Sequence, residues 1–331
     1  MHTVEASPKL RRAPTESVAD VASPGRRVAG FCYRAMVIAR YTALAVVTAC
    51  SGRGGIDRER ANAWFDEVTV DTAPGLSGLA ADAAGGLWTV AERDERAYRI
   101  TLDAALRATT QTFTVKGVPD GTDLEGIAVL GGGRFALGTE GRANGVATVL
   151  LAAQDDDALV VTGAITLPAS SVGIPITNNQ GAEGVCGAGG TIVVSIEGAG
   201  EQDGHRWAPV VRIEAGQIVR THRVWLTTKT GKLSGLDCRV ASDGTIAVVA
   251  IERHFAVAKI LTFTLPARDT ADVTPTEVLD LGPVLNSKLN LEGIAWTSDG
   301  RIVAVVDNQW KTITGPSELL VFRPDVVRLA R

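Results

Sequence analysis

A short phrase recurs five times along the chain, and its spacing restricts the folds that the chain can adopt. It reads LSGL at Leu76, LEGI at Leu124, AEGV at Ala182, LSGL at Leu233 and LEGI at Leu291. The phrase returns about every 50 residues, a period typical of the four-stranded blades of β-propellers. Glycine-rich turns separate the short apolar runs, as in an all-β protein. The repeat therefore predicts an all-β, five-bladed β-propeller.

The last repeat is one predicted strand short of the other four. Each phrase begins a first strand, and three further short, apolar, often β-branched runs follow it in the first four repeats. The fifth repeat has two such runs, whereas the run AWFDEVTV (63–70) precedes the first repeat. We predict that this run pairs with Ser317–Phe322 and closes the ring, because closure removes exposed strand edges. A ring of six blades is the alternative, and it would need a sixth phrase.

Acidic side chains recur at two positions of the repeat. The first strand of a propeller blade lines the central channel, and the second strand runs antiparallel to it. The end of the second strand therefore lies beside the start of the first, where crowding of the first strands requires the repeat glycine. The residues at these two positions are Ser77, Glu125, Glu183, Ser234 and Glu292 before the glycine, and Glu92, Glu140, Glu197, Glu252 and Asp307 at the end of the second strand.

Carboxylates gathered at one mouth of a channel require compensation. Two of them about 5 Å apart repel by roughly 3 kcal/mol at an effective dielectric constant near 20. A cation, basic neighbours or proton uptake can each remove this repulsion. Oxygen ligands without Cys or His favour calcium, with magnesium second, and the predicted metal ligands are Glu125, Glu183 and Glu292. The alternative is a ring of salt bridges to basic neighbours, among them Arg93, Arg142 and Arg253.

The start of the chain indicates export. Residues 1–35 are polar and rich in Arg, Pro and Ser, and translation can instead begin at Met36. The run MVIARYTALAVVTAC resembles a signal peptide ending in a bacterial lipobox at Cys50, although an ordinary signal peptide is the alternative. We expect a leader over 1–50, a flexible linker over 51–61, one propeller domain over 62–325 and a tail over 326–331. The product would be a cell-envelope lipoprotein, or a secreted or periplasmic protein.

The cysteines outside the leader lie in first strands of different repeats. Cys186 and Cys238 stand at even and odd distances from their repeat glycines. Because alternate residues of a strand point to opposite faces, we expect two buried free thiols rather than a disulfide, even in an oxidising compartment.

The order of the five phrases, with acids ending the second strands, resembles two families. These are the SdiA-regulated family and the phytase-like propellers, described as having esterase-like activity of phytase. The similarity covers about residues 62–325. It implies an exported or membrane-attached β-propeller, often with calcium at the channel, and it attaches a hydrolase name to the second family. The residues that carry over are those at the two repeated positions given above.

Two functions from different classes follow. The first is a metal-dependent hydrolase of phosphate or carboxylic esters that acts on a small-molecule or anionic substrate. The second is a non-catalytic envelope propeller that binds a ligand or partner, with a structural metal or a salt-bridged channel.

Asn308, next to Asp307, fits a metal ligand, a substrate contact or a polar loop residue. The net charge of −4 is too small to indicate nucleic-acid binding. A monomer that meets the membrane only through its lipid is expected.

Overall fold

β-Strands are the main regular element of the structure, a computed structural model. The structure describes residues 58–141, 145–269, 272–285, 290–308 and 315–326. The predicted leader over 1–50 lies outside the described residues. Two short helices, α1 (Arg58–Trp64) and α2 (Ala169–Val172), occur in the described segments. None of the helices in these segments is long and apolar enough to cross a membrane. The all-β prediction is confirmed.

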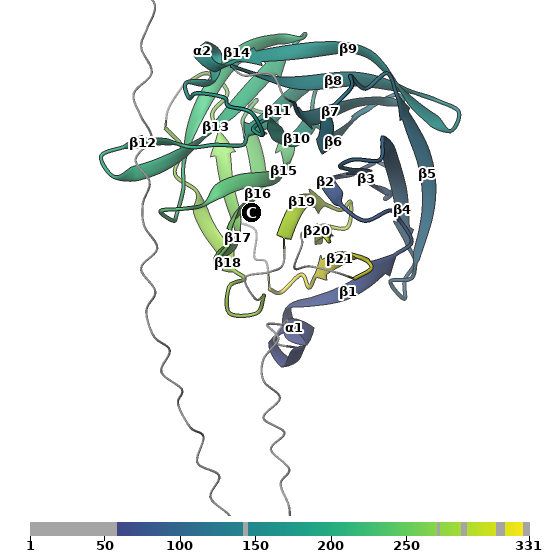
Figure 1. The fold of residues 1–331 in the computed structure, drawn as a ribbon. Coiled ribbons are helices and arrows are strands. Elements are labelled where there is room, and N and C mark those ends of the chain that lie inside the picture. Colours follow the sequence, from purple (N-terminus) through teal and green to yellow (C-terminus); the bar gives the residue numbers. More distant parts are fainter. Residues whose placement is uncertain (1–57, 142–144, 270–271, 286–289, 309–314, 327–331) are drawn as a thin grey trace, which may run out of the picture. The chain divides into compact units, whose positions relative to one another are not determined.

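The strands pair into antiparallel units of four, called blades below and numbered in chain order. Blade 1 comprises β2 (Leu76–Ala81), β3 (Leu87–Ala91), β4 (Arg96–Leu102) and β5 (Ala108–Lys116). Blade 2 comprises β6 (Asp123–Gly131), β7 (Arg134–Glu140), β8 (Val146–Asp155) and β9 (Ala158–Pro168). Parallel pairing of β5 with β9 joins the outer edges of these blades into one eight-stranded sheet (Figure 1).

The later repeats form the remaining blades. Blade 3 contains β10 (Ala182–Ala188), β11 (Thr191–Ile196), β13 (His205–Glu214) and β14 (Gln217–Trp225), with the short β12 (Gly200–Gln202) on β13. Blade 4 contains β15 (Lys232–Val240), β16 (Ile246–His254), β17 (Val257–Leu265) and β18 (Thr276–Asp280). Blade 5 contains β19 (Asn290–Trp296), β20 (Ile302–Asp307), β21 (Ser317–Phe322) and β1 (Phe65–Val70).

The N-terminal strand completes the last blade. β1 lies antiparallel to β21, with Phe65 opposite Phe322 and Val70 opposite Ser317 (Figure 1). The two phenylalanine rings meet edge to face, with 5.4 Å between their centroids. The predicted pairing of the first and last strands is confirmed.

Each blade packs on two neighbours, which explains why its first two strands are buried on both faces. Clusters of buried apolar side chains fill the spaces between successive blades, and one cluster joins blade 5 to blade 1. In blade 3, for example, Val194 packs toward blade 2 and Val193 toward blade 4. The first strands β2, β6, β10, β15 and β19 contact one another in cyclic order at the centre. We call them the inner strands.

The repeat glycines lie where the inner strands come closest. A Cβ atom on Gly78 would lie 2.7 Å from the Cα of Gly126, and one on Gly235 would lie 2.9 Å from the Cα of Gly293. Real Cβ atoms do not approach backbone so closely, so a larger residue would push the blades apart. The predicted reason for the glycine, crowding of the inner strands, is confirmed.

A β-bulge interrupts the inner strands at the repeat phrase. In β6 the pairing with β7 steps from Leu124 to Gly126, so Glu125 is the extra residue, and Ser234 and Glu292 occupy the same position in β15 and β19. The register of β2 and β10 also shifts at the phrase. A bulge takes its extra residue out of the ladder and redirects the side chain. The repeated polar residue is therefore aimed by the backbone.

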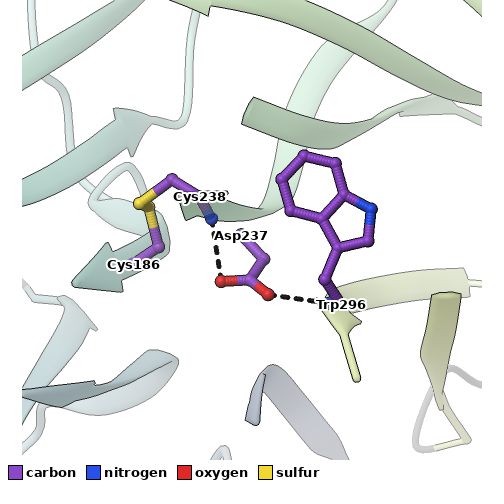
Figure 2. Close-up of a disulfide and its surroundings, with 4 residues drawn as sticks. All are labelled: Cys186, Asp237, Cys238 and Trp296. Carbon is purple, nitrogen blue, oxygen red and sulfur yellow. Dashed lines mark hydrogen bonds between the residues drawn. A yellow bond between two sulfur atoms is a disulfide. The ribbon is translucent and has the colours of Figure 1, made fainter. Parts of the chain in front are cut away.

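Cys186 and Cys238 form a disulfide between β10 and β15, with Cα atoms 5.8 Å apart (Figure 2). The expectation of free thiols was wrong. Successive blades pack with one face of the first against the opposite face of the second, so Cys186 lies beside Val193, Cys238 beside Val248, and all four share one core between blades 3 and 4. Cys186 lies two residues after its repeat glycine and Cys238 lies three residues after its own, so the two side chains are on opposite faces of their blades. Because these two faces pack against each other, the cysteines meet.

A half-buried carboxylate continues this linkage to the next inner strand. Asp237 accepts hydrogen bonds from the backbone N–H of Cys238 at 2.8 Å and from that of Trp296 in β19 at 2.7 Å (Figure 2). Burial raises the pKa of Asp237 to about 6, although both hydrogen bonds favour the ionised form. The inner strands of blades 3, 4 and 5 are thus joined by one covalent bond and one carboxylate.

Candidate functional site

Acidic side chains gather where the inner strands begin and the second strands end, a region called the mouth below. Among the residues that the structure describes, two groups of three carboxylates each bring ligand oxygens within 4.8 Å of one another. The first triad is Glu92, Asp123 and Glu125, from blades 1 and 2. The second triad is Glu140, Glu183 and Glu197, from blades 2 and 3.

The first triad has a weak cationic partner. Glu92 follows β3, Asp123 begins β6, and Glu125 is the buried bulge residue of β6. The Nε atom of Arg93 lies 3.6 Å from Glu92 and 4.0 Å from Asp123, but 63% of the Arg93 side chain is exposed, so water screens its charge. The Ser77 hydroxyl donates to the backbone oxygen of Glu125 at 2.7 Å and to its carboxylate at 3.2 Å.

Burial and like charges raise the pKa values of two acids of the first triad, Glu125 and Glu92. Burial raises the pKa of Glu125 well above its usual range, and the charges of Glu183 and Glu92 raise it further. Burial also raises the pKa of Glu92, against the opposing effect of Arg93 and with reinforcement from Asp307. A divalent cation beside such a carboxyl group favours the ionised form and lowers the raised pKa.

A lysine pairs with two acids of the second triad. Lys232, the first residue of β15, forms an ion pair with Glu197, and its Nζ lies 3.7 Å from the carboxylate of buried Glu183. Glu140 lies at the end of β7 and is half-buried. Burial raises its pKa to about 7, with Glu183 and Asp123 adding to the rise and Lys232 opposing it.

Glu292 is held by an arginine instead. The guanidinium of Arg253 binds both of its carboxylate oxygens, with Nε at 3.0 Å from one of them. The side-chain amide of Asn290 donates to Glu292 at 2.6 Å and to Asp307 at 2.9 Å. Burial raises the pKa of Glu292 to about 7, although Arg253 lowers it. The three predicted metal ligands therefore belong to three different groups, since Glu125 and Glu183 lie in the two triads.

Glu252 has a local structural role. It is fully buried and accepts hydrogen bonds from the N–H and hydroxyl of Thr227, at 3.0 and 2.7 Å. The N–H and hydroxyl of Thr228 donate to its other oxygen, at 3.0 and 2.5 Å. Four donors satisfy this carboxylate, so it holds the loop before β15 rather than a ligand.

Two further predicted residues connect neighbouring blades. The Ser234 hydroxyl donates to the backbone oxygen of Leu291 at 2.9 Å, which links β15 to β19. Asn308 accepts from the N–H of Gly75 at 2.8 Å and donates to the oxygen of Gly315 at 2.7 Å.

Of the remaining predicted residues, Arg142 and Cys50 lie outside the described part of the chain.

Sequence reasoning missed three residues of the mouth. Asp123, Lys232 and Asn290 lie two residues before the repeated Glu125, Ser234 and Glu292. Each is paired with a residue near the end of the second strand, as in Asp123 opposite Glu140 and Asn290 opposite Asp307. Polar side chains two positions before the phrase were the signal that could have found them.

The charges of the mouth do not balance among the described residues. Eight acids stand against three bases: Glu92, Asp123, Glu125, Glu140, Glu183, Glu197, Glu292 and Asp307 against Arg93, Lys232 and Arg253. A site that offers three carboxylates, a nearby hydroxyl and no sulfur or imidazole fits a hard divalent cation. The first triad meets this description, because its basic neighbour is exposed.

Residues 71–309 match the family model of the phytase-like proteins, described as "Esterase-like activity of phytase". The chain belongs to the phytase-like family. The resemblance to the SdiA-regulated family stays a prediction. No curated protein sequence matches the chain.

Solved structures similar to this member of the phytase-like family are distant in sequence. The PQQ-bound aldose sugar dehydrogenase of Streptomyces coelicolor is 13% identical, with a TM-score of 0.43 over 78% of this chain and 98% of the other. Regucalcin, a calcium-binding protein of Agrobacterium tumefaciens, is 12% identical, with a TM-score of 0.42 over 78% and 93%. An exo-β-1,3-galactanase of Phanerochaete chrysosporium is 8% identical, with a TM-score of 0.47 over 77% and 64%.

Proposed function

We propose that the mouth binds a divalent cation, calcium first and magnesium second, at Glu92, Asp123 and Glu125. The loaded site would bind and hydrolyse an anionic phosphate or carboxylic ester. One observation carries the proposal: three carboxylates within 4.8 Å have an exposed arginine as their basic neighbour. A divalent cation would favour the ionised forms of Glu125 and Glu92, whose pKa values are raised by burial and by neighbouring carboxylates.

The residues around this triad provide what ester hydrolysis requires. A bound calcium ion would stabilise the negative charge that develops on the ester oxygens. The exposed guanidinium of Arg93 can bind the acid group of the substrate from the solvent side. Glu140 lies opposite Asp123 in the sheet, and its pKa of about 7 suits a general acid or base at neutral pH.

A non-catalytic binding propeller is the second candidate. This candidate is supported by the polar groups of the mouth that make structural contacts within the fold. Glu252 fastens a loop, Ser234 links two inner strands, and Arg253 neutralises Glu292. In this case the cation at the first triad would be structural, and a ligand or partner would bind above it.

We also propose that the protein is exported, monomeric and anchored to a membrane by a lipid on Cys50. The disulfide between Cys186 and Cys238 supports export, because such bonds persist in oxidising compartments. Cys50→Ala should release the protein from the membrane fraction or block processing. Unchanged mass and unchanged membrane fractionation of the variant would refute the anchor.

Thermal unfolding of chelator-treated protein tests the cation site. Calcium at a hundredfold excess over its dissociation constant should stabilise the native state by about 2.7 kcal/mol. Glu125→Gln should remove this effect. Glu201→Gln, the same change at an exposed glutamate of β12, should leave it intact. No response of the unaltered protein to calcium or magnesium would refute the cation site and favour a salt-bridged mouth.

A panel of phosphate and carboxylic esters then separates the two functions. Turnover that needs calcium and is lost in Glu125→Gln supports the hydrolase. Calcium binding without turnover of any ester in the panel supports the non-catalytic propeller instead.

A further inference from the structure

Both triads at the mouth consist of three carboxylates, but their basic neighbours differ: Arg93 beside the first has a side chain that is 63% exposed, and Lys232 beside the second has one that is 19% exposed. Each contains three carboxylates with ligand oxygens within 4.8 Å. Lys232 projects from the start of β15 in blade 4 to the second triad, where it pairs with Glu197 and lies 3.7 Å from Glu183. Its side chain is 19% exposed, and that of Glu183 is 4% exposed. The ammonium is thus seated among acids from a neighbouring blade.

We propose that Lys232 takes the place of a second divalent cation, so that the mouth holds one ion at the first triad and an ammonium at the second. The proposal rests on the proposed function for the first triad. Lys232 then decides how many ions the mouth binds. The inference concerns a residue that sets metal stoichiometry and does not require that Lys232 touch a substrate.

Charge and geometry support this assignment. An ammonium carries one positive charge and three donors on a flexible stem, so it can bind several carboxylate oxygens at once. Its position beside Glu183 and Glu197 blocks the space that an ion would need and cancels part of the attraction for it. At the first triad, by contrast, Arg93 contacts Glu92 and Asp123 from the solvent side at 3.6–4.0 Å.

Three substitutions at Lys232 separate charge from space. Lys232→Ser removes the ammonium and opens its place, so bound calcium after dialysis should rise from one ion per chain to two. Lys232→Met removes the charge but fills the space, and Lys232→Arg keeps the charge. Both should remain at one ion. The measurement is elemental analysis of calcium per folded chain, with circular dichroism as the control for folding.

The location of each ion is tested by a second substitution. In the Lys232→Ser background, Glu183→Gln should return the count to one, while Glu125→Gln should remove the other ion. One ion in both the unaltered protein and Lys232→Ser would overturn the proposal. No ion in the unaltered protein but one in Lys232→Ser would support the role of Lys232 and refute the proposed site at the first triad.

If Lys232→Ser fails to fold, single glutamate variants still show which triad binds the calcium ion. With Lys232 in place, Glu197→Gln should keep one bound calcium ion, because that triad already has its cation, and Glu125→Gln should bind none. Loss of the ion in Glu197→Gln and its retention in Glu125→Gln would place calcium beside Lys232 and overturn the proposal.

Discussion

The junction between blades 1 and 2 and the junction between blades 3 and 4 use opposite means to hold two inner strands together. At the first, Ser77 donates to Glu125 across the junction, and the acids beside it have an exposed arginine as their cation. At the second, a disulfide joins Cys186 to Cys238, and Lys232 crosses to two acids of blade 3.

The difference shows how one repeated position can take two roles. At the blade 3–4 junction a disulfide fixes the strands and a lysine pairs with the acids, so these acids contribute to the fold. The acids of the blade 1–2 junction have an exposed arginine as their basic neighbour, and they are the ones proposed to bind a cation. Function is therefore expected where the repeat leaves its charges unbalanced.

Removing the disulfide should have the largest effect. Cys186→Ala with Cys238→Ala frees a loop of 52 residues, and the chain-entropy model gives a loss of about 4 kcal/mol in the free energy of unfolding. Denaturant unfolding measures this loss. Calcium affinity should change little, since the first triad lies at the other junction. A large loss of calcium affinity would show that the two junctions are coupled.

Removing the lysine charge should have the next largest effect. Lys232→Met leaves Glu183 and Glu197 without their cation, and we expect a loss of about 2 kcal/mol at pH 8. The loss should shrink at pH 5, because Glu140, whose pKa is raised to about 7, is then protonated and no longer repels the two unpaired acids. Unfolding at the two pH values checks this, and an equal loss at both would mean that packing of the lysine stem, not its charge, matters.

The same Glu→Gln change should have opposite signs in the two triads. In metal-free protein at pH 8, Glu125→Gln removes repulsion and should stabilise by about 1 kcal/mol. Glu197→Gln removes the partner of Lys232 and should destabilise. Melting temperatures of the two variants provide the comparison. Destabilisation by both would indicate that Glu125 has a partner that compensates its charge.

The pH profile should show the smallest but broadest effect. Glu140, Glu292 and Asp237 have pKa values raised to about 7, about 7 and about 6. A raised carboxyl pKa adds stability that is complete below the unfolded value and is lost as the pH rises through the folded value. The melting temperature of metal-free protein should therefore fall between pH 5 and pH 8, and calcium should reduce the fall. A flat profile would contradict these shifts.

The repeat carried enough information to predict the architecture and the place of the mouth. The spacing of the phrase, the missing strand after β21 and the glycine before each apolar run depend on sequence periodicity alone. The pairing of β1 with β21 and the close approach of Gly78 to Gly126 confirm that reasoning. The positions of Glu125 and Glu183 at one mouth follow from the same periodicity.

The hydrogen-bond and ion-pair partners of each acid could not be predicted, because they come from loops and from other blades. Glu252 and Glu140 occupy equivalent positions, but two threonines satisfy the first, while the second lies among other carboxylates. Lys232 reaches across a blade boundary, which strand periodicity does not describe. The disulfide was missed because the alternation of side chains along a strand was used to compare two strands of different blades. Cysteines on opposite faces of neighbouring blades point into the same core.

The pairing of β1 with β21 also has a consequence for the time course of folding. Phe65 and Phe322 come from opposite ends of the described chain, so this contact has a very high sequence separation and forms against the largest loop-closure entropy. Blades 1 to 4 are each built from consecutive strands and can form as they emerge, whereas β1 must wait for β21. We expect docking of β1 to be a late step in folding, with an exposed strand edge on blade 5 until it is complete.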